Sequence, residues 1–357
     1  ILLKKVQGTM KKTVLLLASL APLCAFAQSN VTLFGIVDMG IAHVKTGDKS
    51  ITAVTNSGSN FSRWGIRGTE DLGGGLKAGF WLEAPLSGDV GMGANPLAGM
   101  TFIRRSTVSL MGNFGELRLG QDFTASYHNP AWFDPFQGTG IGQPLAYMML
   151  GAPIRIGNAV SYFLPQSLGG AYGQLQYAFG EEPSGSTNSK KGNYAGIRLG
   201  YANKQLNVAG SVAQYRTGTA TVANKIDIMS VAASYDFGVV KPMAFWASEK
   251  NSSNARIDAY QIGALAPIGT SGELRGTFGF YDRKSSSDDW TKLSLGYVHN
   301  LSKRTALYGT YARVSNRGTS AQVIWTTGLA SAPVSQPLTG KPGGSSSGVE
   351  FGIRHAF

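Results

Sequence analysis

Apolar and polar residues alternate along most of the chain, in segments of about ten residues. In residues 31–44 the apolar side chains share one face of an extended strand: Val31, Leu33, Val37, Met39 and Ile41. Thr32 and Asp38 fall on the opposite face, because successive side chains of a strand point to opposite sides. A tilted strand needs about 9–11 residues to cross a bilayer. The pattern predicts strands with one face toward lipid and the other toward a polar interior.

Sixteen segments of this kind follow one another along the chain. Six lie before residue 163, beginning with 31–44, 61–68 and a return strand from Leu76. The later ones are 173–179, 194–201, 206–215, 228–237, 242–250, 257–266, 274–284, 290–299, 305–314 and 349–357. Closure of the sheet removes unpaired strand edges, which lipid does not tolerate. We therefore expect an all-β fold, a 16-stranded antiparallel transmembrane β-barrel.

The connections between the segments fall into two groups. Residues 112–113 and 203–204 form terse connections, whereas 45–59, 181–193 and 315–347 are long and polar. Short and long connections alternate along the chain, as in transmembrane barrels with short periplasmic turns and longer outer loops. The main alternative, a soluble β-sandwich, gives no reason for this alternation.

Residues 122–153 interrupt the alternation, and they carry Gly, Pro, Met and aromatic residues instead. A connection of this length without regular structure is uncommon unless it is functional. We expect this segment to fold back inside the barrel, where it narrows an aqueous pore.

Composition agrees with a membrane barrel. Charged residues make up only 15% of the chain, against about 25% in soluble domains. After residue 27 no run of 18 apolar residues occurs, so no membrane-spanning helix is predicted. Aromatic residues occur near strand ends, as in the girdles at the two membrane interfaces: Trp64, Tyr162, Tyr177, Phe179, Tyr201, Tyr235, Phe237, Tyr297, Phe351 and Phe357.

The first residues predict export. Residues 1–9 are expected to be an upstream extension, and residues 10–27 a secretory signal peptide with two lysines, an apolar run and an Ala-x-Ala site. Residues 28–357 are then the barrel domain. The formal net charge of +12 falls to +8 when Lys4, Lys5, Lys11 and Lys12 are removed. Cys24 is the only cysteine, so no disulfide framework is expected.

Four motifs resemble the general porins of the Gram-negative outer membrane, of the type found in β-proteobacteria. They are VTLFGIVD at 31–38, SRWGIRGTEDLGGGLKA at 62–78, NLSKRTALY at 300–308 and GIRHAF at 352–357. Together they span the mature chain, and the combination is specific.

The resemblance implies a homotrimer of 16-stranded barrels in which the third outer loop forms the constriction. It also implies that Phe357 is an assembly signal for the outer-membrane insertion machinery. The inward arginines of the family map onto Arg63, Arg67, Arg104 and Arg155, whereas Ser161 stands where the family usually has another arginine. Outer-membrane lipids are the surroundings that the resemblance implies. Lys190, Lys191 and Arg256 on the outer loops are candidates for contact with lipopolysaccharide phosphates, and a solvated surface explains these charges equally well.

Strand parity predicts which charged residues line the pore. The inward bases are Arg63, Arg67, Lys77, Arg105, Arg118, Arg155, Arg198, Arg275, Arg283, Lys292 and Arg354. Inward acids are fewer: Asp38, Glu83, Glu116 and Glu350, with Asp122 and Asp134 on the insert. In the strand 101–111, strict alternation turns Arg105 inward, whereas a bulge would turn Arg104 inward instead.

A narrow pore lined by Arg and Lys favours anions. The chain is therefore expected to form a water-filled channel for passive diffusion of small hydrophilic solutes and ions, with an anion preference. The alternative for these arginines is that they pair with acids and brace the wall.

Other functional classes have weaker support. An outer-membrane hydrolase would need a nucleophile with a positioned base, but no Gly-x-Ser-x-Gly motif occurs and the only histidines are His43, His128, His299 and His355. Metal-ligand spacing is also missing, so we expect no enzyme, no cofactor and no metal. A basic chain can bind nucleic acid, but an exported chain without basic clusters does not point to it. A substrate-specific channel or adhesin-like barrel stays open, although the inward residues are mostly small or charged.

Overall fold

A computed structural model describes residues 30–91, 101–146, 149–326 and 338–357. The predicted extension and signal peptide, residues 1–27, lie outside the described residues. Among the residues that are described, no helix is long and apolar enough to cross a membrane.

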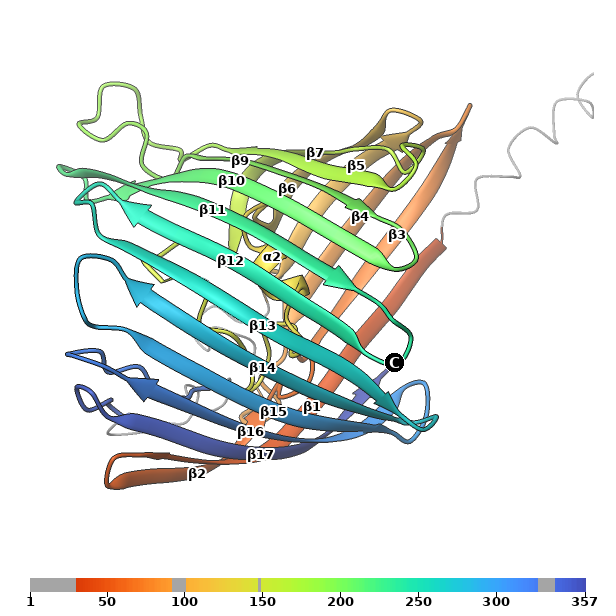
Figure 1. Ribbon diagram of the computed structural model, residues 1–357. Helices are drawn as coiled ribbons and strands as arrows, with labels where there is room; N and C mark the ends of the chain where they lie inside the picture. The colour runs from red at the N-terminus through yellow and green to blue at the C-terminus, as the bar shows by residue number, and fades with distance from the viewer. Residues whose placement is uncertain (1–29, 92–100, 147–148, 327–337) are drawn as a thin grey trace, which may run out of the picture.

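The described chain forms one antiparallel sheet that closes on itself (Figure 1). Its strands are β1 (Asn30–Thr46), β2 (Lys49–Asn56), β3 (Arg63–Gly73), β4 (Leu76–Pro85), β5 (Arg105–Gly112), β6 (Gly115–Phe123), β7 (Arg155–Phe163), β8 (Ala171–Ala178), β9 (Tyr194–Ala202), β10 (Leu206–Gly218), β11 (Ala223–Tyr235), β12 (Lys241–Asn251), β13 (Arg256–Ile268), β14 (Gly272–Arg283), β15 (Trp290–Asn300), β16 (Thr305–Asn316) and β17 (Ser345–Ala356). The short helix α2 (His128–Trp132) lies inside the barrel.

Closure occurs between the first and last strands. β1 pairs with β17 from Ile36 to Thr46. β2 and β3 lie end to end along the other edge of β1, β2 opposite Met39–Thr46 and β3 opposite Asn30–Ile36. These two strands therefore fill one position, and the 17 strands make a 16-stranded barrel. The predicted fold class is confirmed.

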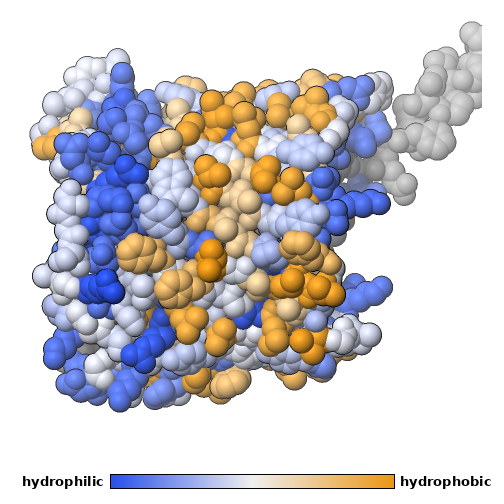
Figure 2. All heavy atoms as spheres, in the orientation of Figure 1, coloured by the Kyte–Doolittle hydropathy of each residue, from blue (hydrophilic) through white to orange (hydrophobic). Residues whose placement is uncertain are grey.

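Side chains alternate between the two faces of the wall as the sequence predicted. Ile262 on β13 is 65% exposed on the outer face, whereas Asp38 and Glu350 are fully buried on the inner face. Figure 2 shows apolar residues across the middle of the outer surface, with hydrophilic residues gathered at the end that carries the long loops. The barrel therefore has an apolar band toward lipid and a polar interior.

Two local predictions were wrong. Residues 45–59 are not a loop, because a turn at Gly47, with φ of 60°, leads directly into β2. The inward residues of β2 include Ala53 and Thr55, so apolar and polar residues do not alternate clearly in this segment and the sequence pattern did not reveal the strand. Ile156 has the same parity as Val160 and Tyr162, so strict alternation turns it toward lipid, but it packs against a buried cluster on the inner face. The register between β6 and β7 shifts there, and Asn158 has φ of 51°, a left-handed conformation that occurs in one type of β-bulge.

Gly120 provides a test of this irregular pairing between β6 and its neighbours. Its φ is 116°, and a Cβ added there would lie 2.1 Å from the backbone O of Ser106. Gly120→Ala is expected to destabilise the barrel by about 1–3 kcal/mol or more, measured as loss of the heat-modifiable folded band on gels. Gly210→Ala is the matched control, since its added Cβ meets nothing closer than 3.8 Å. Equal folding of the two variants would contradict the prediction.

Candidate functional site

The segment between β6 and β7 crosses the inside of the barrel and contacts its far wall (Figure 1). Its buried residues Phe133, Ile141 and Ala146 form one apolar cluster with inner-face residues of the wall, including Phe245, Ile257, Tyr281, Trp290 and Val314. The half of the lumen along β10–β17 is therefore packed. Part of the inner face is less polar than the alternation alone implied.

Buried carboxylates fix the backbone of this inserted segment. Glu249 on β12 accepts hydrogen bonds from the backbone N–H groups of Met149 at 3.1 Å, Leu150 at 2.7 Å and Ala152 at 3.3 Å. Glu350 on β17 accepts one from Ile141 N at 3.0 Å. Hydrogen bonds to charged groups contribute about 1.5–3 kcal/mol each, so these two side chains are strong anchors.

Polar side chains on other strands complete the attachment. Asn129 Nδ2 donates to Ser230 Oγ at 3.0 Å, and the hydroxyl of Tyr281 accepts a hydrogen bond from Leu145 N at 2.9 Å. Lys292 is buried and donates to the backbone O of Gln143. Lys292 was predicted to line the pore, but the structure places it under the insert.

An open cavity of about 960 Å³ remains between the insert and the opposite wall, along β3–β9. Charged side chains from five strands or their ends reach it: Arg63, Glu83, Arg104, Arg105, Glu116, Arg118, Asp122 and Arg198. The helix α2 contributes His128 and Trp132 from the inserted segment. The passage is thus lined by the wall on one side and by the insert on the other.

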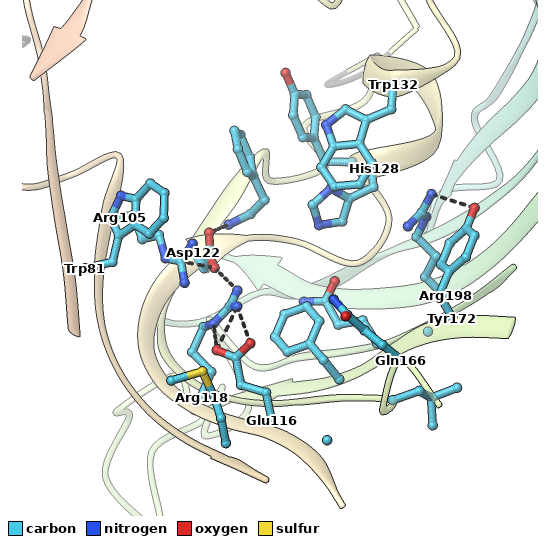
Figure 3. Close-up of a pocket in the computed structure, with 18 of the residues that line it drawn as sticks. Trp81, Arg105, Glu116, Arg118, Asp122, His128, Trp132, Gln166, Tyr172 and Arg198 are labelled. Carbon is cyan, nitrogen blue, oxygen red and sulfur yellow. Dashed lines mark hydrogen bonds and ion pairs between the residues drawn. The ribbon is translucent and has the colours of Figure 1, made fainter. Parts of the chain in front are cut away.

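Four of the arginines share three carboxylates. Glu83 lies 2.6 Å from Arg104 Nε and 3.5 Å from Arg63 Nε. Arg118 contacts Glu116 at 2.8 Å and Asp122 at 2.5 Å, and Arg105 Nε lies 3.5 Å from Asp122. Figure 3 shows the cluster around Arg118 on one side of the cavity. In this part of the lumen the arginines pair with carboxylates and brace the wall, which is the alternative that the sequence analysis gave for them.

Arg155 and Arg198 have no carboxylate within 4 Å among the described residues. Arg155 lies beside the cavity and not in its lining: it donates to the backbone O of Arg104 at 2.9 Å, and its buried Nη2 has no partner within the described part of the chain. Arg198 donates to Asn129 Oδ1 at 2.7 Å and to Tyr172 Oη at 3.3 Å. Six guanidinium groups therefore face three carboxylates in this region, which leaves an excess of three positive charges.

Aromatic rings cover the guanidinium groups, a feature that the sequence analysis missed. Trp81 lies between Arg67 at 4.7 Å and Arg105 at 4.5 Å. The other pairs, measured from Cζ to ring centroid, are Arg67 with Phe34 at 5.2 Å, Arg104 with Phe61 at 4.8 Å, Arg118 with Phe163 at 4.0 Å, Arg155 with Phe123 at 4.1 Å, and Arg198 with Tyr172 at 4.9 Å and Trp132 at 5.3 Å. Trp81 has the same parity as Lys77 and Glu83, so alternation could have placed it inside. The interpretation that inward residues are mostly small or charged was incomplete.

The remaining predicted residues are spread more widely. Arg67 is exposed beside Trp81 and outside the cavity lining, and Lys77 is exposed near the turn between β3 and β4. Asp134 does not face the cavity: it is 1% exposed and accepts hydrogen bonds from Gln261 Nε2 at 2.9 Å and Gly138 N at 3.0 Å. Its carboxylate tightens the turn of the insert against β13.

The structure shows that both Arg104 and Arg105 face the lumen. β5 begins at Arg105, and Arg104 lies just before the regular strand, where its N–H donates to Glu83 O at 3.1 Å. Strict alternation does not apply before the strand begins, so both side chains line the cavity. Glu249 was also missed, although alternation along β12 places it on the inner face with Met243 and Phe245.

Phe357 lies at the seam of the barrel. Its backbone N–H donates to Gly35 O at 3.0 Å, and its own O accepts a hydrogen bond from Gly35 N at 3.1 Å. Its ring occupies the space where a Cβ of Gly35 would lie, at 2.2 Å. The last residue therefore covers the junction between β17 and β1.

Comparison with known proteins agrees with this architecture. A family model described as Gram-negative porin matches residues 13–319. Outer membrane porin protein 32 of Delftia acidovorans is 40% identical over 98% of this chain and 100% of that protein. An outer membrane porin protein of Bordetella pertussis is 30% identical over 85% of this chain and 94% of that protein.

A solved structure, the anion-selective porin from Comamonas acidovorans, is 39% identical and similar with a TM-score of 0.84, covering 92% of this chain and 100% of that one. The chain belongs to the Gram-negative porin family and forms a channel in the bacterial outer membrane.

Proposed function

We propose that this porin is an anion-preferring channel without catalytic activity, in which the insert 122–153 sets the constriction. The observation that carries the proposal is the excess of positive charge at the cavity: five arginines and three carboxylates line it, and Arg155 lies next to this group without a carboxylate of its own. A narrow polar passage with one sign of charge concentrates ions of the opposite sign. Small hydrophilic solutes and anions are the expected cargo.

The positions of the charged groups, as well as their number, support this proposal. Arg155 and Arg198 lie on β7 and β9, while the three carboxylates lie on β4 and β6. The paired groups offset one another, so the two unpaired guanidinium groups dominate the field on their side of the passage. The name of the Comamonas protein describes that protein as anion-selective, in agreement with the proposal.

The ion selectivity can be measured directly. The purified protein in a planar bilayer, with a KCl gradient across it, is expected to give a reversal potential of the anion-selective sign. Raising the salt concentration on both sides is expected to weaken the preference, because exposed charges are screened over about 10 Å at 0.1 M. A reversal potential of the cation-selective sign would refute the proposal.

We also propose that the porin assembles as a homotrimer and that Phe357 is read by the outer-membrane insertion machinery. Support comes from the resemblance and from the position of Phe357 at the seam. Single-channel recordings are expected to close in three equal steps, whereas unitary closure would contradict a trimer. Residues 10–27 remain predicted as a signal peptide.

We propose lipopolysaccharide as a further partner of this porin. Lys190, Arg216 and Lys225 line a small pocket at the end with the long loops. Lipopolysaccharide phosphates fit this charge, since cationic side chains near a membrane surface attract anionic lipid groups.

A further inference from the structure

The cavity has two walls of different chemistry (Figure 3). On one wall Arg118 is tied to Glu116 and Asp122. On the other wall Arg198 extends from β9 toward Tyr172 and Trp132, with no carboxylate beside it in the described part of the chain. An entering anion is therefore attracted more strongly to Arg198 than to Arg118.

Arg198 is held in one orientation before any solute arrives. Its Nε donates to Asn129 Oδ1 at 2.7 Å and its Nη2 to Tyr172 Oη at 3.3 Å. The side chain is only 5% exposed, yet it lines the cavity. Its remaining N–H groups have no protein acceptor in the described chain and are available to a carboxylate, which guanidinium groups bind well.

A buried amide with unused hydrogen-bonding capacity lies beside this guanidinium. Gln174 on β8 pairs in register with Arg198 on β9, so the two side chains are neighbours on the inner face. Gln174 is 3% exposed and its amide lies near the ring of His128, but neither its N nor its O makes a hydrogen bond of regular geometry with any residue that the structure describes. Buried amides are normally hydrogen-bonded, so the amide N is a donor poised for an anionic oxygen.

Trp132 gives the site an open aromatic surface. Its indole is 57% exposed, although the other residues of α2 are buried. It lines the cavity with His128 at 4.3 Å and Arg198 at 5.3 Å from its ring, and the exposed remainder of the ring faces the passage. Trp81 also lines the cavity, but Arg67 and Arg105 cover it within 5 Å. Trp132 is thus a ring in the passage with room for another ring.

We propose that Trp132, Tyr172, Gln174 and Arg198 form a binding subsite for aromatic carboxylates within the passage. Arg198 and Gln174 bind the carboxylate, and Trp132 stacks on the ring. This inference rests on the proposed anion preference and names one class of anion that the channel retains. Transport stays passive, because the subsite only raises the local concentration of such solutes.

Benzoate is the probe, with cyclohexanecarboxylate and acetate as matched monocarboxylates. Chloride current through the reconstituted porin is recorded at constant ionic strength while each potassium carboxylate is titrated. Benzoate is expected to block at a concentration about tenfold below that of acetate, with cyclohexanecarboxylate between the two. Equal potency of benzoate and cyclohexanecarboxylate would overturn the aromatic class, and equal potency of all three would overturn the subsite.

Variants locate the site. Trp132→Leu and Arg198→Gln are expected to abolish the advantage of benzoate over acetate, whereas Trp132→Phe retains it. Trp81→Leu is the control, because it removes a lumenal tryptophan whose ring is already covered. Loss of the benzoate advantage in Trp81→Leu but not in Trp132→Leu would overturn the assignment.

The test separates this inference from the proposed function. A cation-selective reversal potential in KCl would contradict the proposed function. An anion-selective potential without a benzoate advantage would contradict only the subsite. A heat-modifiable folded band of Trp132→Leu on gels, equal to that of the unaltered porin, shows that the variant barrel has folded.

Discussion

Replacement of Arg63, Arg155 and Arg198 together by glutamine is expected to bring the reversal potential in a KCl gradient close to zero. The triple variant removes the excess of positive charge at the passage, where Arg63 and Arg198 line the cavity and Arg155 lies next to it. At about 7 Å in water, one charge contributes about 0.6 kcal/mol to the energy of an ion. Three such charges contribute about 2 kcal/mol before screening, which changes the local anion concentration by about tenfold or more.

The ion pairs predict that the three substitutions contribute unequally to the loss of anion selectivity, with Arg63→Gln contributing least. Arg155→Gln and Arg198→Gln each remove an uncompensated charge, whereas Arg63→Gln leaves Glu83 with Arg104 at 2.6 Å. Arg256→Gln is a suitable control, because Arg256 pairs with Asp258 at 2.8 Å and does not line the cavity. Selectivity that persists unchanged in the triple variant would show that the field arises elsewhere.

Loss of both carboxylate anchors, in the double variant Glu249→Gln and Glu350→Gln, is expected to raise the single-channel conductance and its noise. In each case an amide N–H group replaces an acceptor oxygen beside backbone N–H groups of the insert. Since hydrogen bonds to a charged acceptor are worth about 1.5–3 kcal/mol each, the loss is about 3 kcal/mol or more. An insert held that much less firmly leaves the packed half of the lumen part of the time.

A control separates a loose insert from a changed charge. Glu273→Gln also removes a carboxylate, but Glu273 lies near the start of β14 and pairs with Arg275 at 2.8 Å. We expect its conductance and noise to match those of the unaltered porin. If the double variant conducts like this control, the two carboxylates do not hold the insert.

Much of the candidate site was predictable because strand parity is a local property. The inward positions of Arg63, Arg118 and Glu116 follow from alternation with outward neighbours such as Leu117 and Leu119. Where alternation breaks, prediction fails for a physical reason. Arg104 precedes β5, and Ile156 lies beyond the bulge at Asn158. At such places the backbone conformation, and not the count of residues, decides the face.

Asp134 and Lys292 illustrate a second limit. Parity or position suggested a pore-lining role for both, yet the insert covers them on the packed side of the lumen. Their surroundings depend on contacts between segments more than 120 residues apart. No local pattern states which wall an inserted segment will contact.

The sequence alone determined that this chain forms a closed barrel with a lipid-facing band, a polar interior and one long interruption, because the period of side chains along a strand is local. The tertiary structure decided which guanidinium groups remain without a carboxylate and which aromatic ring remains open. Those properties depend on the register between neighbouring strands and on the wall to which the insert is bonded, and both are set by contacts between residues far apart in the chain.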